Sequence, residues 1–394
     1  MRRATAALLL LAAAGVRAAS PPVPGVSDTE VTFCMTVPLS GPAAAWGALA
    51  VAAETWARHV NEQGGVHGRK LRVQVRDDGY NPGRAIANLH EMKDSCFAVL
   101  GTMGTAVLGA AKDQVAESGV PWIYPLGNPR IFAGMPREKL HAIFVEYPDY
   151  ADEGEFLAQQ AAALEGAKRI AFFGQNDDYG KTGLEGVKRG VAGLPGVTLA
   201  GAALYEVTDR EMGTHALRLK ETGADAVVLY ATSAHAAGLV KEMAKLAYRP
   251  RLFASFTLSD RDRMFGLLAD LWEGAYYDTH LAQRGEPAAD RVLETLLRLE
   301  PSLQGREGTA IHGAMVMMVA VEGLRRAGRD LDRERLVQAL ESLRAWSPAG
   351  LTAPVTFGPG RRHGLNGVRL LRAGKAADRS FTRVGADLLF PPLF

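Results

Sequence analysis

The sequence predicts an α/β protein of two lobes, each a doubly wound parallel sheet covered by helices, joined by a hinge of about three strands. Two observations support the lobes. Short apolar runs alternate with amphipathic segments from residue 31 onward, and the same order starts again after residues 147–150. A third observation supports the hinge, because the last third of the chain has more helices than the second lobe needs. The length of 394 residues also suits two domains.

The N-terminal residues have the three parts of a secretory signal. Met1-Arg2-Arg3 supplies the charge, residues 4–15 form a short apolar core, and small residues precede a cleavage point that we place after Ala18. No later stretch of the sequence reaches about 18 uninterrupted apolar residues, the length that a membrane-spanning helix needs. The sequence therefore predicts that residues 1–18 are a signal peptide and that the remaining chain is exported.

The stretch 37–47 opens the first lobe with the pattern of a strand, a turn and a helix start. Pro42 suits the first turn of a helix, since its missing N–H leaves nothing unpaired there, and Ser40 or Gly41 serves as the turn residue before it. Thr105 is the expected N-cap of a later helix. The elements expected in this lobe are strands 31–36, 71–76, 97–100, 121–124 and 142–146 and helices 43–61, 82–93 and 105–117.

The second lobe is expected to repeat this order, followed by a helical region and a β-rich tail. Its expected elements are helices 152–164, 181–191, 214–220 and 235–246 and strands 169–173, 197–205, 226–230 and 251–254. Helices 288–299, 309–327 and 332–343 come next, and alternation at 355–357 and 368–371 predicts strands. We place chain crossings near 276–279 and 351–355. The first lobe then comprises residues 27–147 with 279–352, and the second comprises 148–278 with 353–394.

Charge and cysteine content limit the partners and the compartment. A net charge of +2 without a dense Lys/Arg stripe argues against nucleic acid, because neutralising phosphates needs clustered positive charge. Cys34 and Cys96 meet an oxidising compartment after export. Both lie in apolar stretches that we expect to be neighbouring strands, so they form either a disulfide or two buried thiols.

Sequence signatures of catalysis are absent. We find no Gly-x-Ser-x-Gly, His-Glu-x-x-His or Gly-x-x-x-x-Gly-Lys pattern. The nine histidines show no metal-ligand spacing, although His235 and His312 fall where they can approach a cleft between the lobes. We therefore expect a binding protein with no enzymatic activity, no metal and no cofactor.

Oxygen-bearing side chains follow the strand ends of both lobes, next to a helix start. They are Ser40, Thr102 and Thr105 in the first lobe and Asn176, Asp177, Thr232, Ser233, Ser255 and Thr257 in the second. For each of them alone, capping a helix is the preferred interpretation. Their recurrence at one edge of each sheet predicts a ligand cleft there. Trp46, one turn into the first helix, either packs in the core or stacks on the ligand.

Several motifs carry a family resemblance. They are Leu39-Ser40-Gly41-Pro42 with Trp46-Gly47, residues 61–70, 76–82, Leu100-Gly101 with Thr105, and residues 119–121, 176–180, 327–334 and 354–358. In this order and spacing they resemble the periplasmic binding proteins of the branched-chain amino acid class, which serve ABC importers and have the type I two-lobed fold. The resemblance covers almost the whole chain after the signal. It implies a periplasmic monomer whose partners are a small-molecule ligand and an ABC transporter permease.

The resemblance also implies where the ligand lies. At the positions matching Met103-Gly104-Thr105, the family holds the ligand carboxylate with a hydroxyl and backbone N–H groups. Trp46 and Tyr179 match the positions where the two lobes contribute aromatic rings. We expect closure of the hinge to bury the ligand under Tyr179, Tyr230 or Phe256.

Two departures from the family pattern leave the ligand class open. Thr257 stands where amino-acid binders place an acid for the ligand ammonium, and a buried ammonium without such a partner is costly. Asp177 or Asp178 would have to replace that acid. Asn128 stands where many relatives have Thr or Ser, and its side chain suits an amide or a hydroxyl. The ligand is therefore amino acid-like, a carboxylate or an amide.

The sequence thus predicts an extracytoplasmic solute-binding protein that captures a small polar metabolite in the interlobe cleft and delivers it to an ABC transporter permease. The alternative is a ligand-sensing or accessory periplasmic protein of the same fold that is not coupled to transport. Neighbouring genes for a permease and an ATPase, as opposed to a receptor kinase or an oxidase, distinguish the two.

Overall fold

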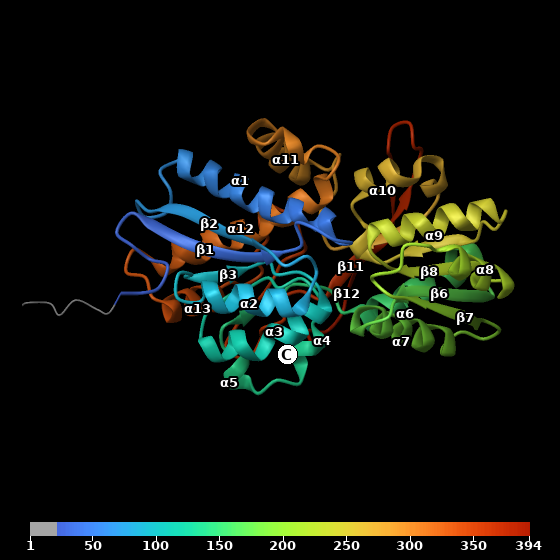
Figure 1. Cartoon of the computed structure of the whole chain (residues 1–394), viewed down its shortest axis with the longest axis horizontal. Helices are drawn as coiled ribbons and strands as arrows, with labels where there is room; N and C mark the ends of the chain where they lie inside the picture. The colour runs from blue at the N-terminus through green and yellow to red at the C-terminus, as the bar shows by residue number, and fades with distance from the viewer. Residues whose placement is uncertain (1–21) are drawn as a thin grey trace, which may run out of the picture.

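The computed structural model describes residues 22–394, so the expected signal at residues 1–18 lies outside the described part of the chain. Two β-sheets form the centres of two lobes that lie side by side (Figure 1). Within the described residues, no helix has the length and apolar content needed to cross a membrane. The expected α/β fold with two mostly parallel sheets is confirmed.

The first sheet has five parallel strands in the order β2-β1-β3-β4-β5. Helices α1 (Ala48–Glu62) and α12 (Glu307–Ala327) pack together on one face, and α2 (Pro82–Met92) and α3 (Thr105–Ser118) pack together on the other (Figure 1). The strands are β1 (Glu30–Val37), β2 (Lys70–Asp77), β3 (Ala98–Leu100), β4 (Trp122–Ile123) and β5 (Ile143–Phe144). The remaining helices are α4 (Arg130–Ala133), α5 (Arg137–Leu140), α11 (Pro287–Leu299) and α13 (Arg333–Glu341).

The second sheet has seven strands in the order β12-β11-β10-β9-β8-β6-β7, of which β11 and β12 form an antiparallel edge. Its strands are β6 (Arg169–Gln175), β7 (Thr198–Tyr205), β8 (Ala226–Tyr230), β9 (Arg251–Ala254), β10 (Tyr276–Thr279), β11 (Gly367–Ala373) and β12 (Phe381–Leu389). Its helices are α6 (Tyr150–Glu165), α7 (Asp178–Ala192), α8 (Gly213–Glu221), α9 (Ser233–Lys245) and α10 (Arg261–Leu268). The central strands are apolar throughout, because helices cover them on both faces.

The apolar core is divided unequally between the lobes. One cluster of buried side chains runs from the first lobe through the hinge to the face of the second sheet that α6 and α7 cover. A separate cluster fills the opposite face of the second sheet, under α8, α9 and α10. The face of the second lobe that meets the hinge is thus continuous with the core of the first lobe.

Three segments connect the two sheets: residues 145–149 after β5, 280–286 after β10, and the chain that precedes β11. Residues 353–363 of that last segment were expected in the second lobe but contact the first. The Phe357 amide donates to the Leu343 carbonyl at 3.0 Å, and the Phe357 ring centre lies 5.2 Å from that of Phe144. We therefore propose that the third crossover lies near residues 364–367.

The last residues return to the first lobe after β12. The backbone amides of Arg362 and His363 donate to the Phe394 carbonyl at 3.1 and 3.0 Å, and the Phe394 ring lies 6.3 Å from that of Phe132. Figure 1 marks this end of the chain beside α3 and α4. The tail thus forms a further connection between the lobes.

The structure contains a Cys34–Cys96 disulfide with a Cα–Cα distance of 5.7 Å, which settles the choice between a bridge and two buried thiols. Three local expectations were wrong. The start of the predicted helix 43–61 is a 3-10 turn over Ala44–Gly47, and Gly104 takes the N-cap place expected of Thr105. Residues 355–357 make one isolated bridge instead of a strand. Helix α10 and strand β12 were not predicted.

Candidate functional site

Loops that follow strands of both sheets meet at the boundary between the lobes. Asn128 Nδ2 donates to Thr182 Oγ1 at 2.9 Å, and Gln175 Nε2 donates to the Tyr80 hydroxyl at 3.4 Å. Both bonds join a residue of the first lobe to one of the second. The cleft is therefore closed in this structure.

On the first lobe, the wall of the cleft consists of the loop around Gly104 and the N-terminus of α3, and we call it the α3 wall. The φ of Gly104 is +108°, and a Cβ there would lie 2.5 Å from the Cε2 atom of Tyr80. Glycine is needed for both reasons. The Gly104 amide donates to the Leu126 carbonyl at 2.8 Å, which fixes the loop against the chain after β4.

The N-terminus of α3 presents hydrogen-bond donors that are not used within the described residues. The Thr105 hydroxyl accepts a hydrogen bond from the backbone N–H of Asn128 at 3.1 Å, so it does not cap its own helix. The backbone amides of Thr105, Ala106 and Val107 have no protein partner among residues 22–394. Such amides, together with the helix dipole, favour an anion. This end of α3 can therefore receive a carboxylate.

On the second lobe, the wall of the cleft consists of aromatic side chains, and we call it the aromatic wall. The Tyr179 hydroxyl is hydrogen-bonded to Thr257 Oγ1, and its ring centre lies 4.7 Å from that of Tyr150. The Tyr150 ring in turn stacks on Phe256 at 5.6 Å. Burial raises the pKa of the Tyr179 hydroxyl well above its usual range, so this group stays neutral. Tyr230 lies beneath these rings, fully buried, with its hydroxyl donating to the Tyr150 carbonyl at 3.0 Å.

The two acids considered as partners for a ligand ammonium are placed differently. Asp177 caps α7, because its Oδ1 accepts from the amides of Tyr179 and Gly180 and its Oδ2 accepts from Gln175 Nε2. Burial raises the pKa of its carboxyl, although these bonds oppose the shift. Asp178 is exposed in the first turn of α7. Neither carboxylate is free and directed at the cleft.

A small pocket lies between the 3-10 turn Ala44–Gly47, α10, α12 and the loop after β9, and we call it the Trp46 pocket. It leaves a volume of about 30 Å³, room for one or two waters. The Trp46 ring stands edge-on to His312 at 6.5 Å. The lining residues are Ala45, Trp46, Ser233, Phe256, Thr257, Leu258, Ser259, Asp260, Arg263, Met264, His280, Leu281, Gly308, Thr309 and His312.

Arg263 places a positive charge in the Trp46 pocket. Its Nε donates to Ser233 Oγ at 2.7 Å, while no oxygen of the described residues pairs with its two terminal nitrogens. The pocket's one acid, Asp260, is already bonded to the Thr309 amide and hydroxyl at 3.1 and 2.8 Å. Burial lowers the pKa of Arg263, although the nearby Asp260 charge opposes this shift. The two terminal nitrogens could donate to an anionic ligand group.

Glu146, His280 and His312 form a buried cluster beside this pocket. Their ligand atoms all lie within 4.8 Å of one another. The sequence spacing of the histidines did not point to this group. These residues are far apart in the sequence and only the folded hinge brings them together, so no spacing rule could detect them.

The structure places the predicted site residues in three sets. Those at the α3 wall are Met103, Gly104, Thr105 and Asn128, and those at the aromatic wall and the Trp46 pocket are Trp46, Asp177, Tyr179, Ser233, Phe256 and Thr257. Ser40 and Tyr230 are not at the cleft surface. Ser40 is exposed and its hydroxyl donates to Asp77 Oδ2 at 2.6 Å, whereas Tyr230 supports the aromatic wall from below.

Sequence reasoning missed Tyr80, Tyr147, Thr182 and Arg263. Tyr80 and Thr182 lie inside or next to motifs that carried the family resemblance, so these motifs contained the signal. Tyr147 directly precedes the expected lobe boundary, and its ring lies 4.7 Å from Phe256. Arg263 belongs to a charged run, Asp260-Arg261-Asp262-Arg263, that gives no hint of a pocket.

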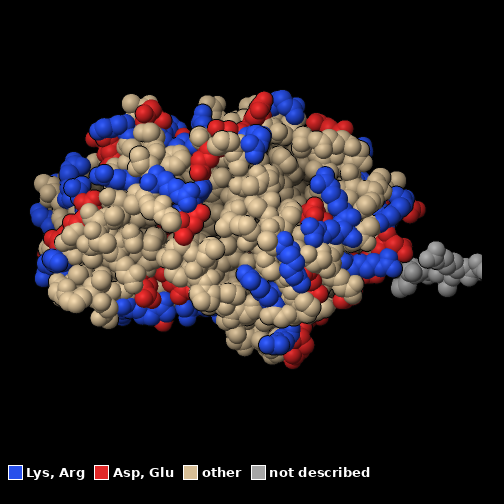
Figure 2. Space-filling view, turned by 180° about the vertical axis from the view of Figure 1, so that it is seen from behind, with Lys and Arg blue, Asp and Glu red and all other residues tan. Residues whose placement is uncertain are grey.

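The surface charge agrees with a small-molecule ligand. On the face shown in Figure 2, Lys and Arg side chains are interspersed with Asp and Glu. This mixture fits the net charge of +2 and gives no continuous basic track for a polyanion on that face.

Comparison with known proteins gives a match over most of the chain. A family model described as "Periplasmic binding protein" matches residues 30–378. Leu/Ile/Val-binding protein homolog 3 from Brucella melitensis is 26% identical over 155 residues, which are 39% of this chain and 41% of that protein. Leu/Ile/Val-binding protein BraC3 from Rhizobium johnstonii is 28% identical over 102 residues, 25% of this chain and 28% of that protein. The matches thus span less than half the length of these curated relatives.

Solved structures show the same fold over nearly the whole chain. A fatty acid ABC transporter substrate-binding protein from Thermomonospora curvata has a TM-score of 0.82 at 22% identity, over 94% of this chain and 95% of that chain. A branched chain amino acid ABC transporter from Thermus thermophilus with bound valine has a TM-score of 0.82 at 19% identity, over 93% and 98%. The resemblance seen in the sequence motifs is confirmed.

Proposed function

Because the chain belongs to the periplasmic binding protein family, we propose that it captures a small metabolite bearing a carboxylate in the interlobe cleft and delivers it to an ABC transporter permease. One observation supports this ligand class above the others. Arg263 lines the Trp46 pocket, and within the described residues only its Nε has a hydrogen-bond partner, while the pocket's one carboxylate is already bonded to Thr309. Arg is well suited to a carboxylate because it offers two parallel donors.

None of the three positions considered as partners for an ammonium offers a free acid, which argues against an α-amino acid. Thr257 is bonded to the Tyr179 hydroxyl, Asp177 caps α7 and Asp178 is exposed. An ammonium brought into this cleft would lose its hydration without gaining an anionic partner. The structural relatives named for a fatty acid and for valine share the fold, and we place this chain closer to the first kind of ligand.

The order of binding follows from the two walls. We propose that the α3 wall, with its fixed amides, receives the ligand while the lobes are apart. Closure then adds the aromatic wall and forms the Asn128–Thr182 bond. The closed, monomeric protein presents both lobes to the permease.

A binding screen tests the ligand class. The chain without residues 1–18 is refolded to remove carried-over ligand and melted with short-chain and aromatic carboxylates, α-amino acids and amides. A ligand at about 100 times its dissociation constant adds about 2.7 kcal/mol to the unfolding free energy. We expect carboxylates to raise the melting temperature of the wild type but not of Arg263→Gln. Arg218→Gln, an exposed change in α8, is the matched control.

Two outcomes contradict the proposal. A shift with amino acids alone shows that an acid moves into the cleft to bind the ammonium. A carboxylate shift that survives in Arg263→Gln shows that another group holds the anion. Delivery is tested separately by adding the loaded protein to a reconstituted permease and measuring ATP hydrolysis; binding without stimulation supports the sensing alternative.

A further inference from the structure

Three buried polar side chains meet where the lobes join. Glu146 follows β5 at the first crossover, His280 follows β10 at the second, and His312 projects from α12. Their exposed fractions are 1%, 8% and 3%. Each comes from a separate segment, so the fold itself assembles the group.

The distances within the cluster suit a shared cation. His312 Nε2 lies 3.3 Å from Glu146 Oε1, and His280 Nε2 lies 3.5 Å from Glu146 Oε2. These two distances end on different oxygens of the carboxylate, and one ligand atom from each of the three residues lies within 4.8 Å of the others. A tetrahedral ion with bonds of about 2.0 Å holds its ligand atoms about 3.3 Å apart, so the three side chains would draw closer together around it.

The cluster has unused ligand atoms. Among the described residues, Glu146 Oε2 and both ring nitrogens of His280 have no hydrogen-bond partner. Buried polar atoms in folded proteins are nearly always bonded, so three such atoms at one point need an explanation. The neighbouring Arg369 is not the missing partner of these atoms, because its guanidinium is paired with Glu286 at 2.6 and 3.0 Å.

The donor types of the cluster also suit a metal ion. Imidazoles bind such an ion in their neutral form, and a carboxylate ligand supplies one negative charge.

We propose that Glu146, His280 and His312 bind a divalent first-row transition ion of the Zn²⁺ type. Two imidazoles and one carboxylate are the donors that these ions prefer, whereas Ca²⁺ and Mg²⁺ take oxygen ligands. Three protein ligands leave at least one coordination position for water. The ion would connect two of the crossovers with α12, and it goes beyond the proposed capture of a carboxylate.

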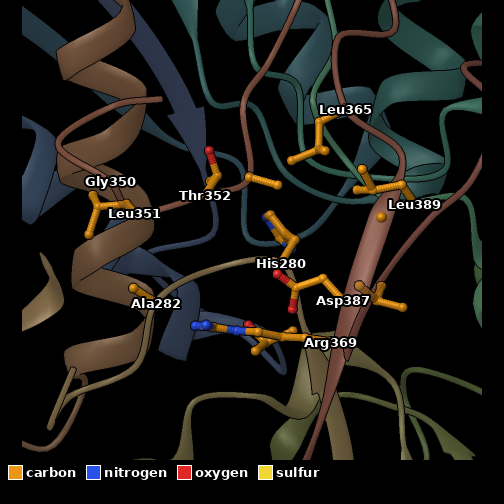
Figure 3. Close-up of a pocket in the computed structure, with 13 residues that line it drawn as sticks. His280, Ala282, Gly350, Leu351, Thr352, Leu365, Arg369, Asp387 and Leu389 are labelled. Carbon is orange, nitrogen blue, oxygen red and sulfur yellow. The ribbon is translucent and has the colours of Figure 1, made fainter. Parts of the chain in front are cut away.

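A second cavity borders the cluster at His280. This hinge pocket has a volume of about 190 Å³, and its lining includes Thr279, His280, Thr352 and Arg369. Figure 3 shows the His280 ring between Thr352 and Arg369 at the wall of this pocket. His280 and His312 also line the Trp46 pocket. His280 thus lies between the two pockets, and Glu146 lines neither of them.

Metal titration of the tag-free chain tests the proposal. The protein is dialysed against a chelator and titrated with Zn²⁺ by calorimetry and with Co²⁺ by visible absorption. We expect one ion per chain. Mutating a residue that only hydrogen-bonds to a metal ligand costs about 10–100-fold in metal affinity. Removing a ligand itself, as in His312→Asn or Glu146→Gln, should therefore weaken Zn²⁺ binding by at least about 100-fold.

The control is His141→Asn, which removes an exposed histidine paired with Glu334 at 2.7 Å. Its affinity for Zn²⁺ should equal that of the wild type. Binding that is lost in His141→Asn but kept in Glu146→Gln would place the ion at the surface and overturn the proposal. Absence of binding to the wild type would do so too. If the buried variants fail to fold, X-ray absorption of the Zn²⁺-loaded wild type decides, since a shell without two imidazoles contradicts the site.

Discussion

The two walls of the cleft differ in what they offer a ligand. The first lobe presents backbone amides at the N-terminus of α3, held by the bonds of Gly104 and Thr105 to the loop after β4. The second lobe presents side chains, chiefly Tyr179, Phe256 and Arg263, which contact Thr257, Tyr150 and Ser233 of the same lobe. The first wall thus consists of backbone groups and the second of side chains. For the carboxylate ligand proposed above, affinity and choice among carboxylates would then have different structural origins.

The same contrast extends to the interiors of the lobes. The first lobe contains the disulfide, and its core continues through the hinge. The second lobe contains no cysteine and places two fully buried acids, Glu153 and Asp278, between α6 and β10. One lobe is stabilised by a covalent link, while the other carries a pH-sensitive pair.

Removing the disulfide should have the largest effect on the difference in stability between the two lobes. The link closes a loop with a sequence separation of 62, so Cys34→Ala with Cys96→Ala should lower the unfolding free energy by about 4 kcal/mol. Denaturant titration measures the loss. Hydrogen exchange should show faster exchange in β1 and β3 and little change in β8. Equal acceleration in both lobes would mean that they unfold as one unit.

The second largest effect should come from raising the pH, which lowers the stability of the second lobe. Burial is the main cause that raises the pKa of Glu153 to about 7, and burial with the nearby Glu153 charge raises that of Asp278. Since the folded pKa lies above the ordinary value of 4.5, the stability from this pair is full below pH 4.5 and is lost as pH rises through about 7. The loss should reach up to about 3 kcal/mol.

Glu153→Gln provides the comparison for the pH effect. The Gln side chain keeps the acceptor that receives the Phe256 amide at 2.8 Å and adds a donor for Asp278. Unfolding free energies at pH 5 and pH 8 should differ more in the wild type than in this variant. The same difference in both proteins would show that the pair does not titrate in this range.

Trp46→Ala tests whether the first lobe also contributes a side chain to affinity. If Trp46 covers the ligand, binding should weaken by about 2 kcal/mol, roughly 30-fold, measured by calorimetry. Trp56→Ala in the helix α1 that follows is the control, because its ring packs on His59 and does not line the Trp46 pocket. A lower melting temperature with unchanged affinity would assign Trp46 to packing alone.

The smallest effect is expected from the bond that joins the walls. Thr182→Val removes the acceptor of Asn128 Nδ2 and should cost the closed form about 1 kcal/mol, a fivefold loss of ligand affinity. Small-angle scattering should show a larger radius of gyration at subsaturating ligand. An unchanged affinity would mean that closure depends on the aromatic wall and not on this bond.

Local patterns in the sequence were sufficient for most of the fold. Strands β8 and β9 have the predicted bounds, because short apolar runs between turn residues define buried strands. Strand β12 was missed since it is an edge strand with few buried side chains and no clear alternation. Helix α10 was missed because its first turn, Arg261-Asp262-Arg263, resembles a solvated loop.

The position of a candidate site residue was predictable where the residue stands beside a strand end. Trp46, Thr105 and Tyr179 do so and lie at the cleft, while their role in binding stays a prediction. Arg263 and His280 contact residues that are distant in the sequence, and no local pattern records such contacts. The roles of Ser40 and Tyr230 were assigned by position in a motif, while the structure commits their hydroxyls to Asp77 and to Tyr150.

The small volume of the Trp46 pocket has a kinetic consequence. A space of about 30 Å³ admits no metabolite, so a ligand can enter only after the lobes separate. Each encounter with the closed form is then unproductive, and the apparent association rate is scaled by the fraction of time spent open. At high ligand concentration the observed rate should stop rising and equal the rate of opening. The hinge, and not diffusion, then sets how fast the protein loads.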